Sequence, residues 1–313
     1  MSMYNFNHLY YFYMTVKSDG VTSASHHLQI SQPSLSSQLK VLEEFLQVKL
    51  FIKVGRKNRL TTEGTVVYGY CRKMFELSEE MHDILTQKTH LAARKIYIGV
   101  SHEIANSFIV EVVSHFLNSF KGIIRPTVYL VKGDHEKLTN QLKFRELDIL
   151  VTQHSLIDPE LNHLSKVEIP VHLIYFCKKK SGSKDIFATI ESHLKDMLGN
   201  ELPCWVLPPA GFKLRSEINN FIDSKSLKGR TVFESDVIES LTRSILDEVG
   251  MSFLPKIYLS DELKQKKLKT FGPDDGLWQH RLWLSCHTAS KTDPLIEAMS
   301  SSFNEICSPA TAN

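Results

Sequence analysis

Four leucines between residues 31 and 51 recur at steps of four, three and four residues. This spacing lines them on one face of a helix, which a small domain can bury. Ser31 can cap that helix, and Pro33 is tolerated in its first turn because the missing N–H would have had no partner within the helix. The sequence therefore predicts a helix that begins at Ser31 or Gln32. The leucines are Leu35, Leu39, Leu42 and Leu46.

The opposite face of this predicted helix is small and polar. Amides and hydroxyls near a helix N-terminus can meet base edges in the major groove of DNA, and the helix dipole favours phosphate there. An amphipathic helix alone more often indicates core packing than DNA binding, so the choice between these two interpretations depends on the neighbouring segments. The candidate DNA contacts are Ser31, Gln32, Pro33, Ser34, Ser36, Ser37, Gln38 and Lys40.

Two predicted helices precede this one, and a basic segment follows it. Apolar residues at helical spacing indicate a first helix over 6–16 and a short second helix over 22–28. Between Phe45 and Thr62 the chain carries five cations and no acidic residue. A solvated loop usually mixes both signs, so a single-sign segment beside a polar helix favours phosphate contact. The cations are Lys49, Lys53, Arg56, Lys57 and Arg59, and we expect Lys53, Arg56 and Lys57 to bind DNA.

A longer helix is predicted from about Thr62 to Gln87. Its apolar residues alternate steps of three and four, which is the pattern of a heptad seam. The seam could pack on its own domain, but the helix lies between two domains, and dimers can contact two half-sites of a symmetric operator. We therefore expect dimerisation. The seam consists of Val67, Tyr70, Met74, Leu77, Met81 and Ile84.

Length and charge agree with a DNA-binding domain attached to a larger body. The chain has 313 residues and 42% hydrophobic content, enough for more than one core. Residues 1–62 hold seven Lys and Arg against three Asp and Glu, which gives +4 there and leaves −2 for the remainder of a chain whose overall charge is +2. No segment is apolar enough to cross a bilayer, and the five scattered cysteines include no CxxC pair. A cytoplasmic protein without membrane partners is expected.

Beyond a polar junction at residues 87–95, strand and helix patterns alternate, which predicts an α/β body. The expected strands are IYIGV, TVYLV, DILVT, VHLIYFC, CWVL, RTVFE, GMSFLP and RLWLSCH. Expected helices cover 106–120, a segment through Leu138 and Leu142, 186–197, 214–222, 237–246 and the C-terminal end.

Candidate effector residues follow the ends of these predicted strands. Ligands of open α/β sheets bind beyond the carboxyl ends of strands and beside helix N-termini. Hydroxyls and amides there, with the charge of Lys132, would suit a small anion or polar metabolite. Each of these residues taken alone is more often an ordinary loop residue than a ligand contact. The candidates are Ser101, His102, Lys132, Gly133, Thr152, Gln153, Pro208 and Gly211.

The segments NHLYYF, TSASHHLQISQPSLSSQLKVLEEFLQVKLF and RLTTEG resemble the LysR-type transcriptional regulators. The resemblance is dense over residues 1–65 and diffuse but ordered beyond. NHLYYF and VKGDHEKL are also similar to the subgroup typified by NhaR, the regulator of sodium/proton antiporter genes. The family often carries Arg or Lys where this chain has Ser37, so one basic contact is absent and operator preference can differ.

This resemblance implies a winged helix-turn-helix at 1–62, a linker and dimerisation helix with a hinge at 63–94, and an effector-binding domain at 95–313. That domain would be similar to a periplasmic binding protein, with lobe one at 95–166 and 268–313 and lobe two at 167–267. The implied function is sequence-specific regulation of transcription, controlled by a small molecule or ion bound between the lobes. Expected partners are operator DNA, a homodimer or homotetramer, and RNA polymerase. By motif, Gln32, Pro33, Ser36 and Ser37 lie in the groove, and Arg56 and Lys57 lie in the wing.

Other functions are less well supported. The sequence has no GxSxG, GxxxxGK[ST] or HExxH motif, so neither an enzyme nor a cofactor is expected. The adjacent His26 and His27 would point about 100° apart on a helix and make a poor chelate, so no metal site is expected. The alternative is a small-molecule or ion receptor whose N-terminal domain serves only dimerisation. The basic wing argues against that alternative, and salt-dependent DNA binding would discriminate between the two.

Overall fold

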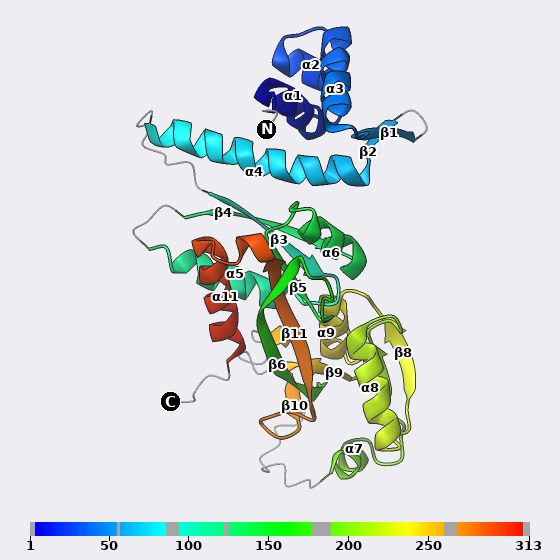
Figure 1. The fold of residues 1–313 in the computed structure, drawn as a ribbon. Helices are drawn as coiled ribbons and strands as arrows, with labels where there is room; N and C mark the ends of the chain where they lie inside the picture. Colours follow the sequence, from blue (N-terminus) through cyan, green and yellow to red (C-terminus); the bar gives the residue numbers. More distant parts are fainter. Residues whose placement is uncertain are drawn as a thin grey trace. The chain divides into compact units, whose positions relative to one another are not determined.

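The computed structural model of the protein describes residues 4–54, 57–85, 94–121, 125–176, 189–259 and 268–308. The chain divides into two compact units (Figure 1). The first holds the N-terminal segment up to Lys95 together with Asn140–Leu147, and the second holds most of the chain from Ile96 onward. No helix within the described ranges has the length and apolar character needed to span a membrane.

The N-terminal unit contains the three predicted helices, a two-stranded wing and one long helix. Ser31 caps α3 by accepting a hydrogen bond from the Ser34 backbone N–H at 3.3 Å, and Gln47 ends the helix in the left-handed conformation. The predicted start of this helix is confirmed. The elements are α1 (Phe6–Lys17), α2 (Val21–Leu28), α3 (Gln32–Leu46), β1 (Phe51–Val54), β2 (Lys57–Leu60) and α4 (Thr62–Leu85).

The leucine stripe of α3 packs into one core with α1. Leu35, Leu39 and Leu42 are buried against Leu9 and Phe12 of α1, while Leu46 is partly buried. The antiparallel pairing of β1 with β2 matches Phe51 with Leu60, and α4 begins directly afterwards. Gly64 lets α4 approach closely, because a Cβ at this position would collide with the carbonyl oxygen of Leu50.

The second unit is an α/β domain of two lobes, as predicted. Seven strands of the described chain form a mixed sheet in the order β10, β6, β11, β5, β3 and β4, with β9 also paired to β6. β7 and β8 form a separate parallel pair. The elements of lobe one are β3 (Lys95–Ser101), α5 (Asn106–Asn118), β4 (Thr127–Gly133), α6 (His135–Lys143), β5 (Ile149–Thr152), η2 (Thr288–Ser290) and α11 (Pro294–Cys307), and the last four residues of α6 group with the first unit. Those of lobe two are α7 (Ile190–Leu198), β7 (Cys204–Leu207), α8 (Lys213–Ser224), β8 (Arg230–Glu234), α9 (Ile238–Leu246), β9 (Ser252–Pro255), η1 (Lys256–Leu259) and β10 (Lys269–Phe271).

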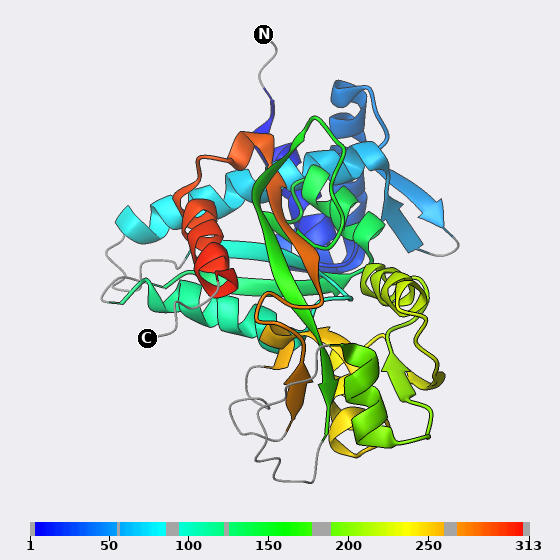
Figure 2. The same cartoon turned by 90° about the horizontal axis from the view of Figure 1, so that it is seen from below.

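Two long antiparallel strands connect the lobes. β11 (Trp278–His287) pairs along its whole length with residues 161–171 of β6 (Leu161–Tyr175), and the end of β6 continues to β9 and β10 (Figures 1 and 2). The sequence predicted only the last third of β6, from Val171 onward, and omitted β10. The first half of β6 is rich in polar residues, and its extended conformation depends on pairing with β11. The predicted helix over 186–197 begins at Ile190, capped by Thr189, and residues 186–188 lie outside the described residues.

Candidate DNA interface and effector site

The predicted groove residues lie at the exposed N-terminal end of α3. Ser31, Gln32, Pro33 and Ser34 are all exposed, as are Ser36 and Ser37, and Gln38 is half-buried. Lys40 lies one turn further along, where its ammonium is 3.7 Å from a carboxylate oxygen of Glu44. This ion pair is exposed on both sides and is worth little energy. The N-terminal turns of α3 therefore present amides and hydroxyls to the surface.

One of the five basic residues in and beside the wing forms an ion pair that was not predicted from the sequence. Lys49 Nζ lies 2.7 Å from Glu43 Oε2, so an acidic residue just before the basic segment neutralises it. Burial raises the pKa of Glu43, but the Lys49 ammonium and the backbone N–H groups of Leu50 and Phe51 outweigh this effect and lower it. Lys53 is exposed on β1.

Two of the predicted wing contacts lie at the turn. Lys57 opens β2, where its backbone pairs with Val54. Arg56 lies outside the described residues. Their proposed DNA contacts stay predictions.

The apolar seam of α4 is exposed on the N-terminal unit. Leu77 retains 66% of its surface and Met81 56%, and Tyr70 and Met74 are also exposed. Another face of the same helix packs on the N-terminal core through Cys71, which is buried. Packing of α4 on its own domain uses Cys71, Phe75 and one residue of the predicted seam, Val67, and it leaves Tyr70, Met74, Leu77 and Met81 exposed.

The predicted effector residues divide into buried and exposed groups. Ser101, Thr152 and Gln153 are buried at the ends of β3 and β5. Gly133 and Pro208 are buried as well, whereas His102 and Gly211 are exposed.

Lys132 is engaged by the protein itself. Its Nζ donates a hydrogen bond of 2.6 Å to the carbonyl of Ile104, and burial lowers its pKa. Lys132 lies within β4, near its end, and its ammonium is directed to this carbonyl and does not line the pocket that lies beside β11.

A pocket of about 350 Å³ lies between the lobes beside β11. Only Gln153 of the eight predicted effector residues lines it. Residues after β5, the first turns of α8 and part of β11 form its wall. The lining consists of Gln153, His154, Ser155, Lys213, Glu217, Trp278, Gln279, Arg281 and Trp283.

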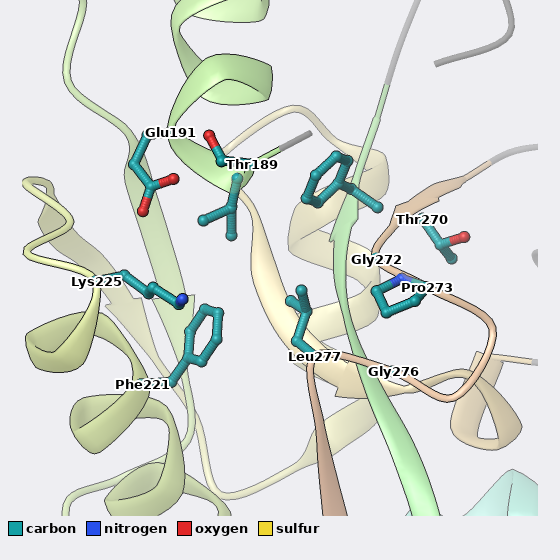
Figure 3. Close-up of a pocket in the computed structure, with 11 residues that line it drawn as sticks. Thr189, Glu191, Phe221, Lys225, Thr270, Gly272, Pro273, Gly276 and Leu277 are labelled. Atoms are coloured by element: carbon teal, nitrogen blue, oxygen red, sulfur yellow. The ribbon is translucent and has the colours of Figure 1, made fainter. Parts of the chain in front are cut away.

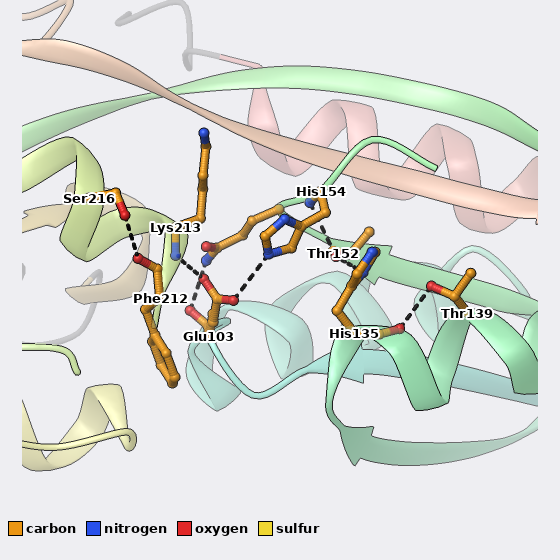
Figure 4. Close-up of polar contacts among 9 residues, drawn as sticks. Glu103, His135, Thr139, Thr152, His154, Phe212, Lys213 and Ser216 are labelled. Atoms are coloured by element: carbon orange, nitrogen blue, oxygen red, sulfur yellow. Dashed lines mark hydrogen bonds and ion pairs between the residues drawn. The ribbon is translucent and has the colours of Figure 1, made fainter. Parts of the chain in front are cut away.

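A polar network borders this pocket (Figure 4). Glu103 Oε2 accepts a hydrogen bond of 2.7 Å from the backbone N–H of Lys213, and Oε1 lies 3.3 Å from His154 Nε2. The ring of His154 packs 4.5 Å from that of His135, whose Nδ1 lies 3.1 Å from Thr152 Oγ1. Both His135 and Thr152 belong to lobe one, while Lys213 opens α8 of lobe two.

A second carboxylate lies within the pocket wall. Glu217 Oε2 is 2.7 Å from Nδ1 of His280, which is fully buried, and accepts a hydrogen bond of 3.2 Å from Trp278 Nε1. Burial raises the pKa of Glu217, but these two donors outweigh it and hold the pKa below its ordinary value.

Comparison with known proteins agrees with this geometry. Residues 6–65 match the model of the bacterial regulatory helix-turn-helix protein, lysR family, and residues 200–307 match the LysR substrate binding domain. The transcriptional activator protein NhaR of Escherichia coli (strain K12) is 30% identical over 213 residues, which cover 66% of this chain and 69% of NhaR. The chain belongs to the LysR family. It is a DNA-binding transcriptional regulator with an effector-binding domain, and not an enzyme.

Solved LysR-family structures share the fold over nearly the whole chain. A full-length OxyR variant from Pseudomonas aeruginosa gives a TM-score of 0.66 at 17% identity and covers 98% of this chain and 97% of that one. Full-length LysG from Corynebacterium glutamicum with bound effector Arg gives 0.63 at 16% identity and covers 96% and 99%. At these identities the likeness shows the fold alone.

Most residues that line the pocket beside β11 were not predicted, because the prediction considered only residues that follow the ends of strands. Gln279, Arg281 and Trp283 alternate along β11, opposite the buried His280 and Leu282. Alternation of this kind is visible in the sequence and could have identified the exposed face of the strand. Glu103 and Lys213 are 110 residues apart, and no local pattern brings them together.

A second hollow of about 650 Å³ lies at the far end of lobe two (Figure 3). Phe221, Leu277 and Pro273 contribute apolar surface, and Glu191 and Lys225 lie near one another on one side. None of the predicted effector residues lines it.

The described residues contain no group of three or more His, Cys, Asp or Glu side chains that could hold a metal ion. His26 and His27 are exposed on α2. Burial raises the pKa of Cys71 and of Cys307 to about 12, so neither thiol is a reactive thiolate at neutral pH. Cys177 lies outside the described residues.

Proposed function

We propose that this LysR-family regulator acts as a homodimer or homotetramer that contacts paired half-sites through the N-terminal turns of α3, and that an effector in the pocket beside β11 changes the spacing of its DNA-binding domains. The observation that supports DNA contact best is the exposed polar surface of α3 from Ser31 to Ser37. Helices with this geometry place their first turns in the major groove.

Pairing of subunits is supported by the exposed seam of α4. Leucine and methionine side chains at heptad spacing lose their contact with water when two such helices associate. A dimer would also match the two-fold symmetry of a palindromic operator, with half-sites one or more helical turns apart.

The wing would add phosphate contacts on either side of each half-site. Lys53 is exposed on β1, and Arg56 and Lys57 follow it in the sequence. Such contacts carry no sequence information but strengthen binding to any duplex, and they weaken steeply as salt rises.

The pocket between the lobes is the proposed effector site. It combines two indole groups with carboxylate, amide and cationic side chains contributed by both lobes. A ligand that contacts both lobes stabilises one of their arrangements over another, which is the thermodynamic requirement for an effector. Contact with RNA polymerase and a cytoplasmic location follow from a role in transcription.

The first experiment is genome-wide capture of DNA bound by the native protein, with a footprint on the strongest site and on its own upstream region. A protected, partly palindromic promoter site, lost progressively between about 50 and 200 mM salt, is the expected result. If folded protein enriches no site at low salt, the paired half-site model is wrong, and the pocket would belong to a receptor whose N-terminal domain only dimerises.

A further inference from the structure

Three helices that begin at the cleft between the lobes lack a cap from their own side chains. α5 follows Ala105, α8 follows Phe212 and α9 follows Val237, and the side chain of none of these residues can accept a hydrogen bond from the first turn of its helix. α7 and α11, by contrast, are capped locally by Thr189 and Asp293. Uncapped N-termini expose backbone N–H groups with partial positive charge, which favour an anion.

The chain supplies two of these helices with a carboxylate from the opposite lobe. Glu103 of lobe one accepts a hydrogen bond from the Lys213 N–H at the start of α8, at 2.7 Å. Glu239 of lobe two accepts one from the Asn106 N–H at the start of α5, at 2.5 Å. The anion-binding ends of α5 and α8 are therefore occupied by side chains of the protein.

Glu103 is fixed in this position from several sides. Only 8% of its surface is exposed, and its second carboxylate oxygen lies 3.3 Å from His154 Nε2. Its backbone carbonyl accepts a 2.9 Å hydrogen bond from Gln153 Nε2. His154, Gln153 and Lys213 all line the pocket of about 350 Å³, so Glu103 lies directly behind the pocket wall (Figure 4).

We propose that Glu103 is a specificity-determining residue of the effector pocket. Its carboxylate occupies the place where a carboxylate or phosphate of a ligand would bind at α8, so the pocket rejects anions and favours a ligand with an ammonium or another N–H donor. This proposal rests on the proposed role of the pocket as the effector site. The effector expected from this proposal is a cation or N–H donor, in place of the small anion that the charge of Lys132 suggested.

Among the other charged groups that line the pocket, the ammonium of Lys213 opposes this selection, but it is exposed to water. Glu217 places a second carboxylate in the wall. The guanidinium of Arg281 is 2.9 Å from Glu168, which offsets its charge. Trp278 and Trp283 add aromatic surface, which accommodates a ring or an organic cation.

Removing the carboxylate of Glu103 should shift the preference of the pocket from cationic towards anionic ligands. In Glu103→Ala the first N–H of α8 and the ammonium of Lys213 would face the pocket without the internal anion, and a ligand carboxylate could take its place. Glu103→Gln keeps an oxygen acceptor but loses the charge, so it should show the same change in smaller degree.

The test uses benzoate and benzylamine, two probes of one size and opposite charge, titrated into the full-length protein by calorimetry. We expect the wild type to bind benzylamine at least tenfold more tightly than benzoate. Glu103→Ala should bind benzoate at least tenfold more tightly than the wild type does. Glu239→Ala removes the matched carboxylate at α5, which does not border this pocket, and should leave the ratio of the two affinities unchanged.

Three outcomes overturn the proposal: a wild type that prefers benzoate, a Glu103→Ala protein that gains no benzoate affinity, and an equal gain in Glu239→Ala. Glu103→Gln provides the same comparison if Glu103→Ala does not fold. A footprint with and without benzylamine separates this proposal from the proposed function. If the probes bind as expected while the footprint is unchanged or absent, the charge selection stands and the regulatory role of the pocket fails.

Discussion

The carboxylate of Glu43 accepts a hydrogen bond of 2.8 Å from the backbone N–H of Leu50 and so ties the last turns of α3 to the residue that directly precedes the first strand of the wing. The same side chain pairs with the ammonium of Lys49 at 2.7 Å. Because α3 and the wing would contact the same DNA site, this bond sets the position of one DNA-contacting element relative to the other. The ion pair with Glu43 holds Lys49 beside the wing and neutralises its charge.

Glu43→Gln should loosen the wing without unfolding the domain. A hydrogen bond to a charged group is worth about 1.5–3 kcal/mol, and its neutral replacement about 1 kcal/mol, so the loss should be about 0.5–2 kcal/mol. Hydrogen exchange of the Leu50 amide in the full-length protein would then accelerate by roughly 2- to 30-fold. The matched control is Glu44→Gln, whose partner Lys40 is exposed, and it should change exchange little. Equal acceleration in both variants would contradict the role given to Glu43.

The same contact predicts a dependence on acid. The pKa of Glu43 is lower in the folded protein than its ordinary value. Its stabilising contribution is therefore present above the unfolded pKa, near 4.3, and is lost as pH falls through the lower folded pKa. The difference in Leu50 exchange between wild type and Glu43→Gln should shrink towards acid pH and stay constant between about pH 6 and 8.

Gln32 and Lys53 should affect DNA binding in different ways. Gln32→Ala removes an amide that can contact a base edge and should relax discrimination at one base position by about 1–3 kcal/mol. Lys53→Ala removes a phosphate contact, should weaken binding to all sequences alike, and should reduce the salt slope by about 1. Competition binding with operator and single-base variants at two salt concentrations measures both. Unchanged discrimination in Gln32→Ala would show that α3 is not the element that contacts the bases at this position.

Local spacing was sufficient to predict the N-terminal domain. The leucine stripe, the Ser31 cap and the proline of the first turn all act within one or two helical turns, so the sequence determines α3 directly. The pairing of Lys49 with Glu43 lay only six residues away, and the sequence-based interpretation missed it by starting the basic segment at Phe45.

The effector pocket could be predicted only in part. The strand-end rule located Gln153, but Ser101 and Thr152 are buried and do not line the pocket. The position of Glu103 beside the pocket is set by its hydrogen bond to the backbone N–H of Lys213. This contact depends on how the two lobes pack and has no local signature in the sequence.

Leu77→Asp should weaken subunit association through α4. Leu77 is 66% exposed on the N-terminal unit, and burying a Leu side chain against a partner contributes about 1.5–3 kcal/mol. Each dimer would carry two such changes, so the dissociation constant of this interface should rise by about 100-fold or more. Sedimentation velocity should show a tetramer becoming a dimer, or a dimer becoming a monomer. The control Leu202→Asp replaces another exposed leucine outside the seam and should leave the oligomer intact.

His280→Ala should destabilise the effector-binding domain in a manner that depends on pH. A carboxylate only accepts hydrogen bonds, so Nδ1 of His280 donates to Glu217 across 2.7 Å, and its removal leaves a largely buried carboxylate with one donor fewer. The expected cost at neutral pH is about 2 kcal/mol, seen as a lower midpoint of thermal unfolding followed by tryptophan fluorescence.

The sign of the pH effect follows from the lowered pKa of Glu217. Stability gained from its ionised form is present above the unfolded pKa and disappears as pH falls through the folded pKa. The difference between wild type and His280→Ala should therefore narrow as the solution is acidified below about pH 4. His115→Gln serves as the control, because the side chains of His115 and Glu305 are 40% and 66% exposed, and a pair this accessible to water should lower the midpoint little when it is lost. A loss for His280→Ala that stays the same at neutral pH and in acid would mean that the cavity left by the ring, and not the bond to Glu217, causes the destabilisation.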